Sequence, residues 1–250
     1  MSGFNRRVGN TVPSLLTAFV TRDPSLPLLT HYDDATGERT ELSAATLANW
    51  VAKTANLLVD GCGLGPDDVA GVPLPPHWQT AAVLLGAWSA GLTVSFDEPG
   101  DVVFAPLDRV AGKAPGDQIT AVDQPGLPEL KAADRFVLGF APMGMPMRDV
   151  PPGWVDYIAE VRGFGDFFSG PGPTPQTPAF PGLSHAAMID QSPPMPENTR
   201  VLIDADEHPS PRYWLIAPLA AGSSVVIVTH TDKARLDAKA ASERATPVAP

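Results

Sequence analysis

The chain has 250 residues, a formal net charge of -11 and an isoelectric point near 4.7. This length is sufficient for one large domain or two small ones with a substantial hydrophobic core. An acidic surface repels phosphate backbones, so nucleic acid is not an expected partner. No stretch reaches the ~18 consecutive apolar residues of a membrane-spanning helix. Cys62 is the single cysteine, which excludes an internal disulfide or a thiolate zinc cluster and favours the cytoplasm.

Residues 1–26 are expected to form a lead-in and an amphipathic helix that begins near Pro13. Their apolar run, 15–20, is too short for a secretory signal peptide, and no small-residue cleavage site precedes Arg22. The N-terminus is therefore interpreted as part of the folded protein.

A hairpin and a helix are predicted next. Residues 27–32 and 39–42 indicate two short strands around a turn that contains Gly37. Ser43 is a suitable N-cap for the following helix, and Gly61 is suitable for its end.

The stretch from 69 to 96 carries the clearest signal. An apolar run at 69–74 is followed by two prolines, a long apolar segment at 78–90, Gly91 and a second β-branched run at 92–96. This order predicts a βαβ unit with a buried helix, two parallel strands and a right-handed crossover.

The remaining elements are predicted from short apolar runs and helical spacing. The strands are 102–105, 135–141, 200–203 and 224–229, and the helices are 154–161, 184–192, 212–221 and 232–244. The last helix is rich in alanine and lysine and is expected to be exposed. We expect loops and a short helix between 105 and 135, a loop at 142–152 and a tail at 246–250. Between 163 and 181, proline and glycine are too dense for regular structure.

Alternating strands and helices indicate an α/β fold with a mostly parallel sheet flanked by helices and a small antiparallel opening. We expect one domain at 27–232, loop-rich over 142–182, followed by a C-terminal helix and tail at 233–250. Ligands of such sheets bind beyond the carboxyl ends of the strands. A site is therefore expected in the loops after Leu74, Phe96, Ala141 and Ile203.

Residues 182–186 (GLSHA) approximate the nucleophile elbow of α/β-hydrolases. The acids and histidines that follow in the required order are Asp204 or Asp206 and His208 or His230. An elbow needs a strand leading into its serine, whereas Pro175, Pro178 and Pro181 precede Ser184. We favour Ser184 as the N-cap of a helix.

Three other constellations have simpler explanations. The candidate metal ligands His185, Asp206, His208 and His230 contain no pair at helical i, i+4 spacing, so no metal site is predicted. The glycines of 169–174 (SGPGPT) would let N–H groups converge on phosphate, but the prolines remove donors and no lysine follows. An apolar ligand site would be lined by Trp50, Trp78, Trp88 and Met188. We interpret these residues as core, with His77 at a helix start as an exception.

Several segments resemble the N-terminal half of the adenylate-forming superfamily, which includes acyl-CoA synthetases, luciferases and peptide-synthetase adenylation domains. TGERTELSAATLANWVAKTANLL is similar to the opening hairpin and first helix of that family. GLGPDDVAGVPLPPHWQTAAVLLGAWSAGLTVSF is similar to its next strand, helix and turn. GLSHAAMIDQS resembles the segment after its phosphate loop, and RYWLIAPLAAGSSVVIVTH resembles a wall of its apolar pocket. The resemblance runs from about residue 27 to 232.

The chain departs from that family where the resemblance implies catalysis. The family grips ATP phosphates with a Ser/Thr/Gly-rich loop followed by Pro-Lys-Gly, but SGPGPTPQTPAF stands here without lysine. The adenine segment, the ribose-binding aspartate and the catalytic lysine of the family's C-terminal domain have no counterpart. Because acyl adenylation needs positive charge on the transferring phosphates, no catalytic residue is assigned.

The resemblance implies that AMP, ATP or acyl-CoA is the ligand. The candidate binding residues are Ser169, Gly170, Gly172, Thr174, Ser184, His185 and His208. The predicted function is a non-catalytic nucleotide- or acyl-binding, or regulatory, module. The alternatives are an interaction subunit and an acid-adenylating enzyme completed by a partner chain. A homodimer or partner subunit would cover the sheet edge that a shortened domain leaves open.

Overall fold

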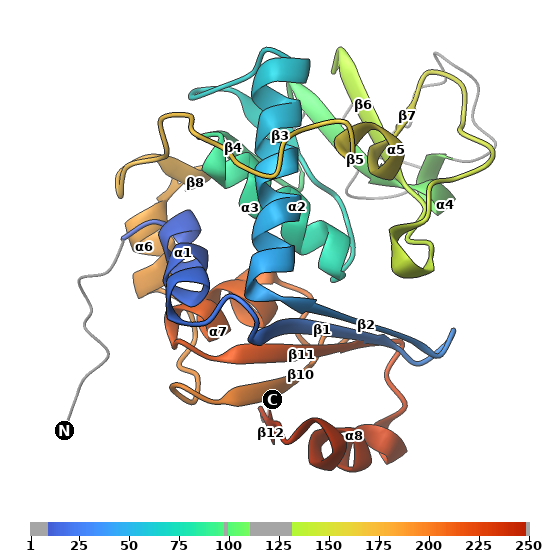
Figure 1. Ribbon diagram of the computed structural model, residues 1–250, viewed down its shortest axis with the longest axis vertical. Helices are drawn as coiled ribbons and strands as arrows, with labels where there is room; N and C mark the ends of the chain where they lie inside the picture. Colours follow the sequence, from blue (N-terminus) through green and yellow to red (C-terminus); the bar gives the residue numbers. More distant parts are fainter. Residues whose placement is uncertain (1–9, 98–99, 111–131, 249–250) are drawn as a thin grey trace. The chain divides into compact units, whose positions relative to one another are not determined.

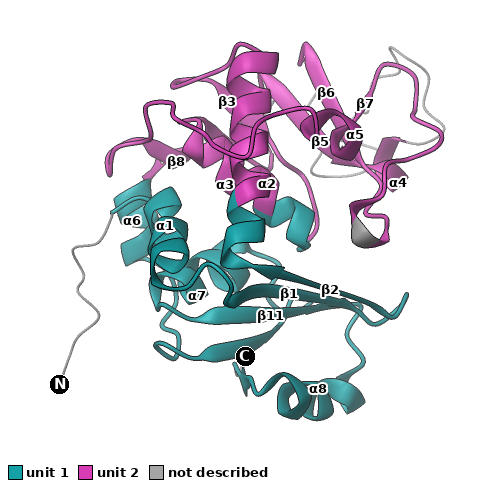
Figure 2. Ribbon diagram, in the orientation of Figure 1, with its two compact units in different colours: residues 1–48, 76–81, 185–250 teal, residues 49–75, 82–184 magenta. Residues whose placement is uncertain are grey.

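The computed structural model describes residues 10–97, 100–110 and 132–248. The chain forms two compact units (Figure 2). Unit 1 consists of 1–48, 76–81 and 185–250, and unit 2 consists of 49–75 and 82–184. The helices α2 (Ala44–Asn56) and α3 (Trp78–Ser89) each contribute residues to both units. None of the helices in the described ranges has the length and apolar character needed to cross a membrane.

Unit 1 is built on a sheet in the order β12-β10-β11-β1-β2, in which every neighbouring pair is parallel except β1 and β2 (Figure 1). Its strands are β1 (Pro27–Asp33), β2 (Glu38–Ser43), β10 (Arg200–Asp204), β11 (Ser224–Thr229) and β12 (Thr246–Pro247). Its helices are α1 (Val12–Arg22), α6 (His185–Asp190), η3 (Arg212–Ile216), α7 (Ala217–Ala220), η4 (Lys233–Arg235) and α8 (Leu236–Glu243).

The central strand β11 is buried at every position, as its sequence SVVIVT predicts for a strand covered on both faces. Val226 and Val228 pack with Leu202 of β10 and Ala240 of α8. Figure 1 shows α8 on one face of this sheet, with α1 and α7 on the other. The predicted parallel arrangement with an antiparallel opening hairpin is therefore confirmed for unit 1.

Two predictions for the C-terminal residues are wrong. The expected tail forms β12, in which Thr246 pairs with Val201 of β10. The helix expected to be exposed buries Lys239, whose Nζ lies 2.6 Å from a carboxylate oxygen of Asp34. Both features depend on residues more than forty positions away, so local sequence pattern does not indicate them.

Unit 2 contains a second sheet, in the order β4-β3-β5-β6-β7, with all neighbouring strands parallel. Its strands are β3 (Val69–Gly71), β4 (Thr93–Ser95), β5 (Val102–Pro106), β6 (Asp134–Leu138) and β7 (Val155–Asp156), with a separate hairpin of β8 (Pro178–Phe180) and β9 (Leu183–Ser184). Its remaining helices are η1 (Leu57–Gly61), α4 (Leu107–Val110), η2 (Pro142–Gly144) and α5 (Tyr157–Val161). The predicted βαβ unit is confirmed, with β3 and β4 parallel and Gly91 at a positive φ of 89° after α3.

The prediction that the proline-rich segment 163–181 lacks regular structure is wrong for its last residues. Pro178–Phe180 and Leu183–Ser184 form a short antiparallel hairpin. Proline is tolerated there because this two-stranded ribbon has no third strand to which a missing N–H would matter. Trp88 anchors the hairpin, since its Nε1 donates to the Ala179 carbonyl oxygen at 2.9 Å.

Three further predicted boundaries need correction. The predicted helix at 154–161 starts late: its first part forms β7, and the side chain of Asp156 caps α5 by accepting from the Ile158 N–H. The strand predicted at 135–141 ends at Leu138, and a 3-10 turn at Pro142–Gly144 interrupts the predicted loop. Most of the loop predicted between 105 and 135 lies outside the described residues.

The close approach of α2 and α3 in unit 2 depends on Gly86. A Cβ atom at this position would lie 2.5 Å from Cβ of Thr54 and 3.2 Å from the carbonyl oxygen of Val51. Thr54 cannot move freely, because its Oγ1 is hydrogen-bonded to the buried Tyr157 hydroxyl at 2.7 Å.

We predict that Gly86→Ala lowers the free energy of unfolding by about 1–3 kcal/mol, because overpacking forces the two helices apart. Urea denaturation followed by circular dichroism measures this change. Gly172→Ala is the matched control, because a Cβ there has no atom within 4 Å. Equal stability of the two variants would contradict the predicted close packing.

Candidate functional site

The segment that precedes the predicted phosphate loop is fastened to α2 within unit 2. Lys53 Nζ donates to the Phe164 carbonyl oxygen at 2.6 Å and forms an ion pair with Asp166 at 2.9 Å. Asn56 Nδ2 donates to the carbonyl oxygens of Gly165 and Phe167, each at 2.9 Å. These bonds fix the entry to the loop.

The loop itself, 169–174, offers few groups to a phosphate. Pro171 and Pro173 have no N–H, and the N–H of Thr174 donates to Thr177 Oγ1 at 3.0 Å. The N–H groups of Ser169, Gly170 and Gly172 remain, without a nearby lysine in the sequence. A phosphate bound here would lack the positive charge that phosphate loops supply.

Ser184 and His185 are adjacent in sequence but belong to different units. Ser184 ends β9, and His185 is the first residue of α6. His185 is fully buried, its Nδ1 accepts from the Val12 N–H at 3.3 Å, and burial lowers its pKa to about 4. The neutral imidazole of His185 therefore has a structural role, because it holds the start of α1.

His208 lies at the carboxyl end of β10, where the fold predicts a ligand. Its N–H donates to the Asp204 carbonyl oxygen at 3.1 Å, and its ring stacks on Tyr213 with a centroid distance of 3.8 Å. Its Nε2 is buried and has no hydrogen-bond partner among the described residues. Of the seven predicted binding residues, His185 and His208 thus lie in unit 1, and the other five lie in unit 2.

The acids at the same end of the sheet form ion pairs and hydrogen bonds. Burial opposes the charged form of Asp204, but hydrogen bonds from Lys233 and Thr231 outweigh it and hold the Asp204 pKa below its usual range. Asp206 accepts from the N–H groups of His230 and Thr231. These acids are therefore occupied by structural contacts.

These contacts do not fit the hydrolase triad that the sequence pattern approximates. His230 Nδ1 lies 2.9 Å from a carboxylate oxygen of Asp33, and His208 stacks on an aromatic ring. Neither imidazole bonds to the carboxylate of Asp204 or Asp206 in the contacts described for unit 1. Without that bond, no base is oriented toward a serine nucleophile.

The metal ligands considered from the sequence do not group together either. Among the described residues, His31, Glu38 and His77 have one ligand atom each within 4.8 Å of the others. Burial lowers the pKa of His31 to about 4 and that of His77 well below its usual value, so both imidazoles are neutral near pH 7. Two histidines and a carboxylate are a ligand set that zinc or iron accepts.

The hydrogen bonds of the two imidazoles limit this set. Thr229 Oγ1 donates to the Tyr32 carbonyl oxygen, so His31 Nε2 is assigned the donor role toward Thr229 and Nδ1 keeps a lone pair. His77 Nδ1 accepts from the Gln79 N–H at 3.1 Å, which assigns the proton of a neutral ring to Nε2. A metal ion bound at His77 Nε2 would have to displace that proton. The two histidines are therefore better suited to remain a pair of neutral imidazoles than to bind a metal.

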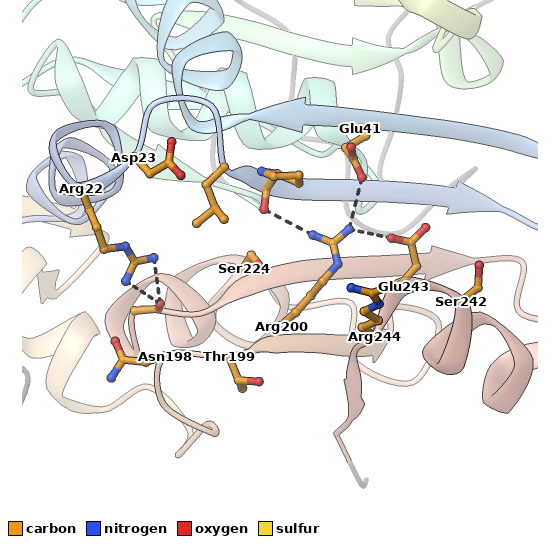
Figure 3. Close-up of a pocket in the computed structure, with 13 residues that line it drawn as sticks. Arg22, Asp23, Glu41, Asn198, Thr199, Arg200, Ser224, Ser242, Glu243 and Arg244 are labelled. Carbon is orange, nitrogen blue, oxygen red and sulfur yellow. Dashed lines mark hydrogen bonds and ion pairs between the residues drawn. The ribbon is translucent and has the colours of Figure 1, made fainter.

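A cavity of about 800 Å³ lies at the other end of the unit 1 sheet, beside the amino ends of β1, β10 and β11 (Figure 3). Its charged lining residues are Arg22, Asp23, Glu41, Arg200, Glu243 and Arg244. This location differs from the carboxyl-end loops expected from the fold. In Figure 3, Arg200 reaches toward both Glu41 and Glu243.

The sequence carried one overlooked signal for this cavity. Arg22 shortly precedes β1, Arg200 begins β10, and Arg244 shortly precedes β12. Because these strands are parallel, residues before each of them meet at one edge of the sheet. The arginines are far apart in sequence, so only the strand order brings them together.

Comparison with known proteins gives one clear relative and many structural neighbours. No family model matches the chain. The chain is 38% identical over 248 residues to a TIGR03089 family protein from Mycobacterium tuberculosis, with 94% of this chain and 96% of the relative covered.

Solved structures of acyl-CoA synthetases share the fold. A Brucella canis acyl-CoA synthetase has a TM-score of 0.66 at 15% identity, covering 97% of this chain and 47% of its own. The N-terminal domain of FACL13 from Mycobacterium tuberculosis has a TM-score of 0.62 at 12% identity, covering 94% of this chain and 61% of its own. The chain thus spans about half to three fifths of the length of these structures. It has the α/β fold of an acyl-CoA synthetase N-terminal domain, as the sequence resemblance predicts.

The buried His31 predicts a loss of stability in mild acid. Burial lowers its pKa from 6.5 to about 4, against the opposing charge of Asp33. As the pH falls, the unfolded chain therefore takes up this proton before the folded chain does. Protonation of His31 therefore lowers the free energy of unfolding by up to about 1.4 kcal/mol per pH unit below 6.5. This decline ends near pH 4, where the folded state is also protonated.

Urea unfolding at pH 7, 6 and 5 measures this slope. In His31→Gln, we expect the decline between pH 6 and pH 5 to be smaller by about 1.2 kcal/mol, slightly less than the contribution of one full proton. A variant whose stability falls in parallel with the wild type would show that His31 does not titrate as described.

Proposed function

The chain belongs to the TIGR03089 family, and we propose that it is a non-catalytic binding module of AMP-binding-like fold that holds a nucleotide or an acyl-CoA. One observation carries this proposal: the chain has the synthetase fold, but the segment at the position of the phosphate loop lacks the residues that bind phosphate. The segment 169–182 has five prolines and no lysine. Phosphoryl and adenylyl transfer depend on cationic groups that neutralise the developing charge, and such groups are missing from this loop.

His208 supports a ligand at the carboxyl end of the unit 1 sheet. Its buried Nε2 has no partner in the described part of the chain, and a buried polar atom of this kind is costly unless a ligand or water satisfies it. The stacked Tyr213 ring holds the imidazole in one orientation. We assign His208 as a binding residue on these grounds.

The two edges of the unit 1 sheet give less support to an interaction subunit. At one edge, Pro247 of β12 has no N–H to offer an added strand. At the other edge, β2 carries Glu38, Arg39 and Glu41. Proline and charged side chains are the features that discourage edge-to-edge pairing. We therefore place a homodimer or partner subunit below ligand binding among the proposed roles.

Calorimetric titration with AMP, ATP, CoA and an acyl-CoA tests the proposal, together with carboxylate-dependent pyrophosphate exchange. We expect binding of at least one of these compounds and no exchange above background. Exchange by the purified chain would show that it is a catalyst, and the absence of binding to all four compounds would remove the proposed ligand class.

The role of His208 has its own test. His208→Ala removes one hydrogen bond to the ligand, and we expect its dissociation constant to rise about 3- to 10-fold. His230→Asn is the matched control, because asparagine tolerates the positive φ of 50° at that exposed position. Equal affinity of His208→Ala and the wild type would remove His208 from the site.

A further inference from the structure

We propose that the unit 1 cavity beside the amino ends of β1, β10 and β11 binds a small oxyanion, the phosphate or carboxylate group of a metabolite. Arg244 and Arg22 provide the charge that holds it. The ligands of parallel α/β sheets ordinarily lie at the carboxyl ends of the strands, so this is a second site that is independent of the nucleotide or acyl site proposed above.

The acidic residues of the cavity are already occupied. Glu243 forms ion pairs with Arg39 at 2.9 Å and with Arg200 at 2.8 Å. Glu41 forms ion pairs with the same two arginines, at 2.8 and 3.3 Å. Asp23 accepts from both the N–H and the hydroxyl of Ser25, which holds its pKa below the usual range.

Two guanidinium groups are left without a carboxylate partner. Arg22 donates to the Gly222 carbonyl oxygen at 3.3 and 3.4 Å and lies over the Phe19 ring, 4.6 Å from its centroid. It forms no ion pair among the described residues, although its charge, after the hydrogen bonds from Ser25, helps to lower the Asp23 pKa. Arg244 lines the same cavity, and the ion pairs that the described residues form with Glu41 and Glu243 do not include it. The lining carries three guanidinium groups and three carboxylates, and Arg39 from outside the lining shares two of those carboxylates, in a chain of net charge -11.

The backbone at Arg244 is an independent sign that its side chain is used. Arg244 follows α8 with φ 50° and ψ 40°, the left-handed conformation that glycine normally supplies after a helix. A non-glycine residue pays about 1 kcal/mol for this conformation. Glycine would be the more stable choice at this position, so the arginine is a stability cost that anion binding would explain.

The rest of the lining is suited to an oxyanion. Asn198, Thr199 and Ser242 place an amide and two hydroxyl groups around the same cavity (Figure 3). Arg200 Nε is buried and has no acceptor among the described residues. A cavity of about 800 Å³ has room for a small metabolite, since ligand pockets commonly measure about 300–1,000 Å³.

Isothermal titration with sodium phosphate, and separately with sodium citrate, in low-salt chloride buffer tests this site. We expect at least one probe to bind the wild type, and the stronger of the two identifies the preferred oxyanion. In Arg244→Gly we expect affinity to fall at least 10-fold while the melting temperature stays the same or rises, because glycine relieves the backbone. Arg22→Gln should also weaken binding.

Arg235→Gln is the matched control, an exposed arginine that adjoins the start of the same helix and loses the same charge. It should bind the probe as the wild type does. The proposal is overturned if neither probe binds, if Arg244→Gly and Arg22→Gln both retain wild-type affinity, or if Arg235→Gln weakens binding equally. His208→Ala should leave phosphate and citrate binding unchanged, so failure of this site and failure of the nucleotide or acyl proposal are distinguishable.

Discussion

The complete burial of β11 is the constraint on which unit 1 depends. Every residue of this strand is buried, and it pairs in parallel with β1 on one side and β10 on the other. A strand covered on both faces leaves no room for unpaired polar groups along its length. The two candidate ligand sites of the unit accordingly lie at the two ends of the sheet, where the strands begin and where they end, whereas the neutral imidazole of His31 lies within it.

The two ends satisfy their charges differently. At the carboxyl end, Asp34 pairs with the buried Lys239, and Lys233 bonds to Asp204 and Glu207. At the amino end, Glu41 and Glu243 are shared between Arg39 and Arg200, and Arg22 and Arg244 stand outside those ion pairs. The carboxyl end therefore offers an orphaned imidazole nitrogen on His208, and the amino end offers cations. Each end suits a different class of ligand.

In unit 2, the prolines at 171–178 affect backbone hydrogen bonding without preventing local structure. Pro171 and Pro173 remove N–H donors, whereas Pro178 starts one strand of a small hairpin. The hairpin is held by Trp88, which is itself fully buried. The prolines that remove N–H donors at 171 and 173 are thus compatible with the packing of the hairpin that follows them.

Local sequence determined the α/β class, the opening hairpin, the βαβ unit and the buried character of β11, because these depend on the spacing of apolar residues and on nearby glycine and proline. Only the tertiary structure decided that 246–247 form a strand, that Lys239 is buried, and that Arg22, Arg200 and Arg244 share one cavity. These features join residues that are distant along the chain, and strand order, which no local pattern encodes, sets which of them meet.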